Sequence, residues 1–206
     1  MVDAVMKWIV KKIRKGIIHK FLRKFGTRAT KQRIWDEEFR SGSWEYIDHT
    51  KNDPIYPVLA RYCKGGDILD LGCGAGNTGN ELDVGNYNRY DGVDVSAEAV
   101  ERASKRSRKN GRDGKNSYFV DDIVTFVPQK RYSIILLRES LFYLPMSRIS
   151  QTLKRLSEYL IEDGFLIVRM CDRHRYSSIV EIIKNEFHVC EEAFPKGEAS
   201  IILVFR

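Results

Sequence analysis

The chain has 206 residues, 43% of them hydrophobic and 11% aromatic, and carries a formal net charge of +7. This length and composition suit one α/β domain with a buried core. No apolar run approaches the roughly 20 residues that a membrane-spanning helix requires. The four cysteines are scattered without a Cys-x-x-Cys pair, which argues against a metal site and a disulfide framework. We therefore expect a cytoplasmic protein without a signal peptide.

The positive charge is concentrated at the amino end. Residues 1–33 contain eleven Lys or Arg and one acid, Asp3, so they carry +10 and the remainder carries −3. Residues 4–25 have the pattern of a basic amphipathic helix, with apolar residues at every fourth position from Val5 to Phe25. Such a helix can bind a membrane surface or an acidic partner. Alternatively, it packs its apolar stripe on the protein's own core.

Two further helical segments precede the first expected strand, at residues 32–39 and 54–64. We expect residues 1–29 to form a helical extension and residues 30–206 one domain, in which 30–64 act as a cap. The aromatic side chains of this cap either line a substrate pocket or pack helix against sheet: Trp35, Trp44 and Tyr46.

A glycine-rich loop follows the short apolar run at residues 68–71. Gly72, Gly74 and Gly76 stand at every second position, and glycine allows positive φ and a close approach of ligand to backbone. A dinucleotide fold requires G-x-G-x-x-G, and a phosphate loop requires a Lys-Ser or Lys-Thr after the glycines. No Lys-Ser or Lys-Thr follows the glycines, so a P-loop enzyme is excluded. The glycines from Gly72 to Gly76 follow a G-x-G-x-G order, and on this spacing a Rossmann dehydrogenase is the least favoured enzyme class.

The string from Asp70 to Gly76 resembles motif I of class I S-adenosylmethionine-dependent methyltransferases. A second apolar run, residues 90–94, ends in Asp94, 18 residues after Gly76. A carboxylate at this spacing can accept hydrogen bonds from both hydroxyls of a ribose. A simpler reading is that Asp94 or Ser96 only caps the helix expected at 97–109.

The resemblance implies a Rossmann-like, seven-stranded, mostly parallel sheet with helices on both faces and a final antiparallel hairpin strand. It also implies S-adenosylmethionine as cofactor and S-adenosylhomocysteine as product. Asp122, after the strand at 117–120, best matches the acid that binds the adenine amino group, with Ile123 beside the base and Asp121 as the alternative. The full set of expected cofactor residues is Asp70, Gly72, Cys73, Gly74, Gly76, Asp94, Val95, Asp121, Asp122, Ile123 and Arg138.

The strand expected at 132–137 leads into a segment resembling motif IV of ubiquinone-biosynthesis-type O-methyltransferases. Glu139, Leu141 and Pro145 match that motif, whereas Ser133 replaces its usual Asp and Tyr143 its usual His. The Asn-Pro-Pro-Tyr string of enzymes that methylate base amines is absent here.

The last third of the chain predicts a helix at 147–160, a turn at 162–164, strands at 165–170, 189 and 200–205, and a helix at 177–186. His174 follows the strand at 165–170, at the edge where open α/β sheets bind ligands. The catalytic candidates are Tyr143, His174 and Glu139. Arg138 or Arg173 could hold an anionic acceptor through a bidentate fork.

We expect a methyltransferase acting on O or N of a small molecule, and the basic amphipathic start suggests a lipid-linked or glycan-pathway acceptor. An RNA or protein methyltransferase is one alternative, although no RNA-binding signature supports nucleic acid as partner. A non-catalytic cofactor-binding subunit is another. Residues 4–25 could place the protein at a membrane surface, and the sequence does not specify an oligomeric state.

Overall fold

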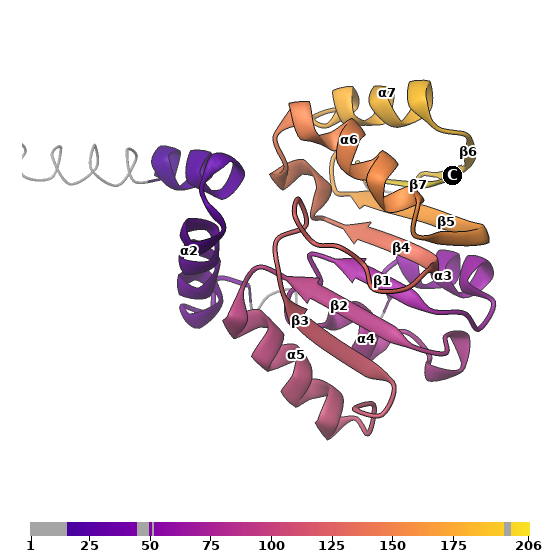
Figure 1. The fold of residues 1–206 in the computed structure, drawn as a ribbon, viewed down its shortest axis with the longest axis horizontal. Coiled ribbons are helices and arrows are strands. Elements are labelled where there is room, and N and C mark those ends of the chain that lie inside the picture. Colours follow the sequence, from indigo (N-terminus) through magenta and orange to yellow (C-terminus); the bar gives the residue numbers. More distant parts are fainter. Residues whose placement is uncertain (1–15, 45–49, 51, 196–198) are drawn as a thin grey trace, which may run out of the picture.

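The computed structural model describes residues 16–44, 50, 52–195 and 199–206. Its centre is a seven-stranded sheet with the order β3-β2-β1-β4-β5-β7-β6 (Figure 1). Strands β1 to β5 are parallel, and β7 runs antiparallel to β5 and β6. The expected fold class is confirmed. The strands are β1 (Ile68–Leu71), β2 (Tyr90–Asp94), β3 (Asn116–Val120), β4 (Tyr132–Arg138), β5 (Leu160–Met170), β6 (Val189–Ala193) and β7 (Ile201–Phe205).

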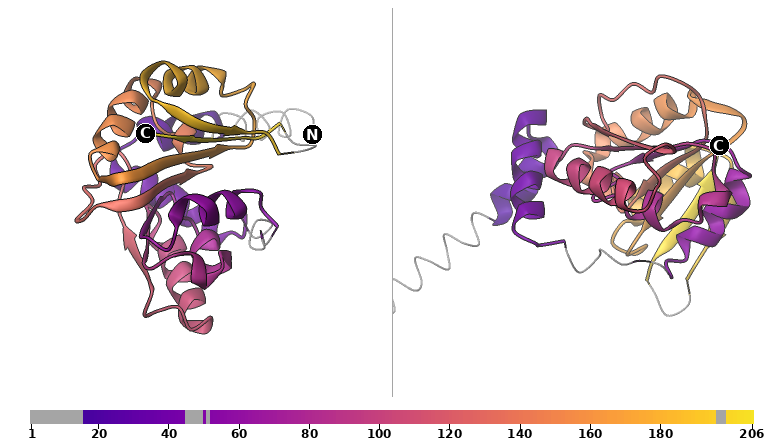
Figure 2. Two further views of the ribbon diagram at one scale, coloured as in Figure 1. Left: turned by 90° about the vertical axis from the view of Figure 1, so that its right-hand side faces the viewer. Right: turned by 90° about the horizontal axis from the view of Figure 1, so that it is seen from below.

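Helices cover both faces of the sheet (Figure 2). One face packs against α3 (Ile55–Cys63), α4 (Asn77–Glu81) and α5 (Ala97–Lys109), and the other against α6 (Met146–Ser157) and α7 (Ser177–Glu186). Successive side chains of a strand point to opposite faces, so Leu69 and Leu71 pack toward α6 and α7 while Ile68 packs toward α3. Burial on both faces explains why the central strands are nearly continuous apolar runs.

The turn predicted at residues 162–164 is wrong. Glu162–Gly164 lie inside β5, and α6 ends at Ser157 rather than at residue 160. Pairing with β4 is irregular there, because Leu160 pairs with Tyr132 and Phe165 with Ile134. The additional residues are accommodated in a bulge, where turn-forming residues are tolerated without ending the strand.

The amino-terminal region lies beyond the carboxyl ends of the strands. Residues 16–25 are helical and α2 (Arg28–Arg40) follows, with the arrowheads of β1, β2 and β4 pointing toward it (Figure 1). The Thr27 hydroxyl accepts from the Thr30 N–H and caps α2, and the expected boundary at residue 29 falls inside this helix. Asp36 fastens α2 to the start of α5, since its Oδ1 accepts from Ser96 Oγ at 2.7 Å and from Glu98 N at 3.1 Å.

The expected helix 4–25 is described only from residue 16. There, Ile17, Phe21 and Phe25 are 64%, 60% and 55% exposed, so this part of the apolar stripe does not pack on the core of the protein. Within the described ranges, no helix combines the length and the apolar character needed to cross a membrane.

Candidate functional site

A cavity of about 590 Å³ lies between the carboxyl ends of the strands and the amino-terminal helices, which are residues 16–25 and α2. The glycine loop lines one side of the cavity, and aromatic and basic side chains of the amino-terminal helices line the other. Nine of the eleven expected cofactor residues line it: Asp70, Gly72, Cys73, Gly74, Asp94, Val95, Asp122, Ile123 and Arg138. Gly76 shapes the loop from behind, and Asp121 lies outside the lining.

The glycine loop needs glycine for two reasons. Gly72 and Gly76 have φ of +83° and +76°, which side-chain-bearing residues rarely adopt. A Cβ on Gly72 would also lie 2.4 Å from the Ser140 Cβ, and one on Gly76 would lie 2.7 Å from the Ala103 Cβ. The loop therefore combines an unusual backbone with tight packing, and this keeps its main chain open to the cavity.

Asp70 lies buried at the end of β1, next to this loop. The Tyr90 hydroxyl donates to its Oδ2 at 2.5 Å, whereas its buried Oδ1 has no hydrogen-bond partner among the described residues. Burial raises the pKa of Asp70 to about 6. A buried acceptor without a donor costs free energy, so this oxygen is suited to a donor supplied by a ligand, such as an ammonium group.

Asp94 occupies the end of the neighbouring strand β2. Its Oδ2 accepts from Gly74 N and its Oδ1 from Ser96 N, both at 2.9 Å, and each oxygen keeps further lone-pair capacity for a diol. Burial raises the pKa of Asp94. The capping role belongs to Ser96, whose Oγ accepts from Ala99 N at 3.1 Å, so Asp94 is available for a ligand.

Helix α2 is anchored to the segment after β3. Lys31 Nζ lies 2.7 Å from Asp122 Oδ2, and Arg28 Nη1 lies 2.9 Å from Asp121 Oδ1. Of these two acids only Asp122 lines the cavity, together with Ile123. This geometry favours Asp122 over Asp121 as the ligand-facing acid.

Arg138 extends from the end of β4 and is engaged by the protein itself. Its guanidinium forms an ion pair with Asp53 and lies 3.3 Å from Thr78 Oγ1 and 3.4 Å from the Tyr56 hydroxyl. We conclude that Arg138 shapes the wall of the cavity by holding Asp53, which comes from the segment before α3.

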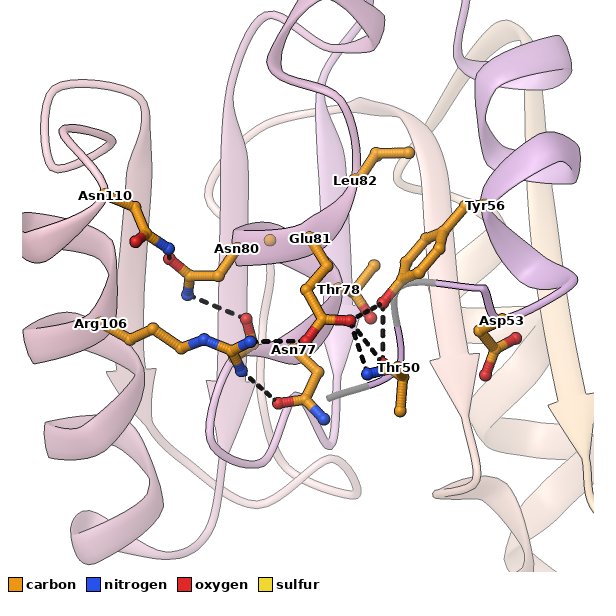
Figure 3. A network of polar contacts seen from close by, with 12 residues as sticks. Thr50, Asp53, Tyr56, Asn77, Thr78, Asn80, Glu81, Leu82, Arg106 and Asn110 are labelled. Carbon is orange, nitrogen blue, oxygen red and sulfur yellow. Dashed lines mark hydrogen bonds and ion pairs between the residues drawn. The ribbon is translucent and has the colours of Figure 1, made fainter. Parts of the chain in front are cut away.

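A polar network around Glu81 fixes that same segment (Figure 3). The Glu81 side chain is 2% exposed. Its Oε2 accepts from Thr50 N at 2.9 Å, Thr50 Oγ1 at 2.8 Å and the Tyr56 hydroxyl at 3.0 Å, while its Oε1 pairs with Arg106 at 2.5 Å. One carboxylate thus connects α4, α5, α3 and the cavity-lining Thr50.

The opposite end of the cavity is aromatic. Trp35 of α2 meets Tyr143 edge to face at 4.9 Å, and Phe142 stacks on Tyr176 at 4.3 Å. Burial raises the pKa of Tyr143 to about 12, so its hydroxyl stays neutral at physiological pH. Trp44 also lines this end, whereas Tyr46 lies outside the described residues.

Of the catalytic candidates, Glu139 lines the cavity with Tyr143, and His174 does not. Glu139 has a φ of +56°, and its carboxylate accepts from Arg169 Nη1 at 2.5 Å and from Cys171 N at 3.0 Å. Burial raises the pKa of Glu139. His174 is exposed beyond β5.

Arg173 lies outside the cavity lining, with its guanidinium carbon 4.9 Å from the Phe194 ring centroid. The cavity also contains basic residues that the sequence did not single out as ligand-facing: Arg23, Lys31 and Arg169.

Comparison with known proteins agrees with this architecture. Residues 68–164 match the family described as methyltransferase domain. The curated 27-O-demethylrifamycin SV methyltransferase of Amycolatopsis mediterranei is 25% identical over 119 residues, which cover 54% of this chain and 44% of that protein. The chain therefore spans less than half the length of this relative.

Solved structures share the fold. The N-methyltransferase NodS of Bradyrhizobium japonicum WM9, in complex with S-adenosyl-L-homocysteine, has a TM-score of 0.65 at 20% identity, covering 79% of this chain and 90% of that chain. Magnesium protoporphyrin IX methyltransferase of Synechocystis PCC 6803, with bound S-adenosylmethionine, has a TM-score of 0.62 at 18% identity, covering 93% and 96%. Residues 68–164 thus match a methyltransferase domain in sequence, and the chain shares the fold of these methyltransferase structures.

Proposed function

We propose that this chain, whose residues 68–164 match a methyltransferase domain, is a class I methyltransferase that transfers a methyl group from S-adenosylmethionine to an O or N atom of a small molecule. Three carboxylates around the glycine loop support the proposal. Asp70 would receive the ammonium of the methionine part, Asp94 the ribose hydroxyls and Asp122 the adenine amino group. The observation that carries most weight is Asp70, which lines the cavity and whose buried Oδ1 has no hydrogen-bond partner among the described residues.

The bound cofactor supplies a methyl group already activated on a sulfonium, so the protein needs chiefly to position the acceptor. Effective alignment of reacting groups accounts for much of the rate of such enzymes. Trp35, Tyr143 and Phe142 form walls that hold an apolar or planar acceptor. The neutral Tyr143 hydroxyl can donate to, or accept from, the reacting group of the acceptor, and Glu139 holds the adjoining wall through Arg169.

Radiolabelled S-adenosylmethionine tests this function directly. The purified protein is incubated with a cell extract and labelled cofactor, and the products are fractionated by mass. The proposal expects label in the low-mass fraction. Label confined to RNA or protein would instead support the alternative acceptor classes, and cofactor binding without any transfer would support a non-catalytic subunit.

The amino-terminal helix supports a finer proposal, a peripheral contact with an anionic membrane surface. Phe21 and Phe25 are exposed with ring centroids 4.8 Å apart, and Lys20 and Lys24 lie beside them in sequence. Exposed aromatic groups next to basic side chains are typical of interfacial helices.

Flotation with anionic vesicles measures that contact. Replacing Phe21 and Phe25 by serine removes apolar area and should reduce the bound fraction severalfold. A double serine variant at Val84 and Val127, which are 44% and 52% exposed elsewhere on the surface, is the matched control and should bind like the natural protein. Equal binding of all three proteins would refute the membrane contact and favour a protein partner.

A further inference from the structure

Arg23 joins the acceptor end of the cavity from outside the methyltransferase domain. It belongs to the helical residues 16–25, yet its side chain lines the cavity and is 21% exposed. Its guanidinium carbon lies 4.9 Å from the centroid of the Trp35 ring, and Trp35 in turn contacts Tyr143. Arg23 therefore stands beside the aromatic walls proposed to hold the acceptor.

The protein satisfies this guanidinium only in part. Glu38 Oε1 pairs with Arg23 Nη2, and Glu38 Oε2 accepts from Trp44 Nε1 at 3.2 Å. The Nε atom of Arg23 is buried and has no hydrogen-bond partner among the described residues. Since a buried donor without an acceptor is costly, the geometry leaves a specific N–H for a ligand acceptor.

The neighbouring cations of the cavity are already paired with acids of the protein. Lys31 pairs with Asp122, Arg138 with Asp53, and Arg169 with Glu139. Arg23 is also paired, with Glu38, but among the described residues its Nε has no acidic neighbour of the kind that Asp53 Oδ1 provides at 3.3 Å from Arg169 Nε. An oxyanion bound at Arg23 would use the Nε–H, which the ion pair with Glu38 leaves without an acceptor in the described part of the chain.

The helix formed by residues 16–25 does not bury its apolar face, as an amphipathic helix usually does. At 100° per residue, Arg23 lies on the side opposite Phe21 and Phe25, and these two rings face solvent. Burial of the phenylalanines would be the ordinary way to dock such a helix. Instead, the face turned toward the cavity is the one that carries the arginine.

We propose that the methyl acceptor carries an oxyanion, a carboxylate or a phosphate, beside an apolar or planar body, and that Arg23 binds this anion while Trp35 and Tyr143 pack on the body. The proposal rests on the function proposed above and narrows its substrate class. Guanidinium groups bind carboxylates and phosphates through N–H donors, and Arg23 lies over the Trp35 ring at the same end of the cavity.

Small probes test the anion preference. Benzoate, phenyl phosphate and the neutral isostere benzamide are titrated into ¹⁵N-labelled protein with and without S-adenosylhomocysteine, and arginine Nε–H signals are followed by NMR. We expect an anionic probe to shift the Arg23 signal and to bind roughly tenfold more tightly than benzamide, in keeping with a charge-assisted hydrogen bond. The stronger of the two anions identifies the carboxylate or phosphate class.

Three variants make the result specific to Arg23. Arg23→Gln should remove the preference for anions, and Arg23→Lys should retain part of it while identifying the Arg23 signal by its loss. Arg33→Gln changes the same charge at an exposed position of α2 and should behave like the natural protein. Equal binding of benzoate, phenyl phosphate and benzamide, or an anion preference that survives in Arg23→Gln, would overturn the proposal.

Different results would contradict the proposed function and the proposed role of Arg23. Absence of S-adenosylhomocysteine binding would contradict the proposed function, whatever the probes do. Binding of S-adenosylhomocysteine without any anion preference would contradict only the role of Arg23. The titration without S-adenosylhomocysteine decides the role of Arg23 even if the cofactor does not bind.

Discussion

The two ends of the cavity, to which we assign the cofactor and the methyl acceptor in the proposed function, are built in different ways. At the cofactor end, the backbone dominates: three glycines with positive φ present the main chain, and backbone N–H groups orient Asp94. At the acceptor end, side chains dominate, with Arg23, Trp35 and Tyr143 coming from three separate elements. A conformation encoded in a short contiguous segment can support one common ligand, whereas an assembly of distant side chains can vary with the acceptor.

If the backbone defines the cofactor end, the largest effect should come from one added methyl group in the glycine loop. Gly72→Ala would combine a strained φ, at about 1–2 kcal/mol, with a clash against Ser140 that adds about 1–3 kcal/mol. Gly111→Ala has a similar φ of +65° but nothing within 4 Å of the new Cβ, so it carries the strain alone.

Urea unfolding and calorimetric titration with S-adenosylhomocysteine compare these two variants. Gly72→Ala should be the less stable and should lose cofactor binding, while Gly111→Ala should bind normally. Equal stability and equal binding in the two variants would show that the loop tolerates a side chain and that the backbone account is wrong.

This difference between the two ends explains which site residues could be predicted from the sequence and which could not. Motif spacing placed the glycine loop, Asp94 and Asp122, because those features lie within short segments whose geometry follows from residue type. Arg23 and Glu81 had no such signal, since a single charged residue on a helix is ordinary and its partners are distant in sequence. The strand at Glu162–Gly164 was missed because turn-forming residues can also occupy a bulge.

A buried acid at the cofactor end should make stability depend on pH. The pKa of Asp70 in the folded protein, about 6, exceeds its ordinary value of about 3.9. The folded state therefore binds more protons than the unfolded state between these values, and stability should fall by about 2–3 kcal/mol as pH rises from about 4 to above 6.

Asp70→Asn should remove that contribution. In urea unfolding across this pH range, the variant should gain stability relative to the natural protein as pH rises, and excess S-adenosylhomocysteine should stabilise only the natural protein. A difference between the two proteins that does not change with pH would contradict the assigned ionisation of Asp70.

The network around Glu81 tests how much side-chain interactions contribute to the stability of the cavity wall. Glu81→Gln weakens the pairing with Arg106 and should destabilise the fold by about 2 kcal/mol, less than a fully buried ion pair would, because Arg106 is 24% exposed. It should also loosen Thr50 and Asp53 at the cavity wall.

The matched control is Glu101→Gln, which removes an exposed pair with Lys105 on α5 and should leave thermal stability unchanged. Thermal unfolding of both variants measures the difference. Identical melting temperatures would show that the Glu81 network does not hold the segment before α3.

Calorimetric titration of an Asp94→Ala variant with S-adenosylhomocysteine tests the central claim most directly. Two hydrogen bonds to a charged carboxylate should be lost, so affinity should fall at least about 100-fold, while Asp113→Ala, an exposed acid outside the cavity, should bind as the natural protein does. Unchanged affinity in Asp94→Ala would contradict the assignment of the cofactor site.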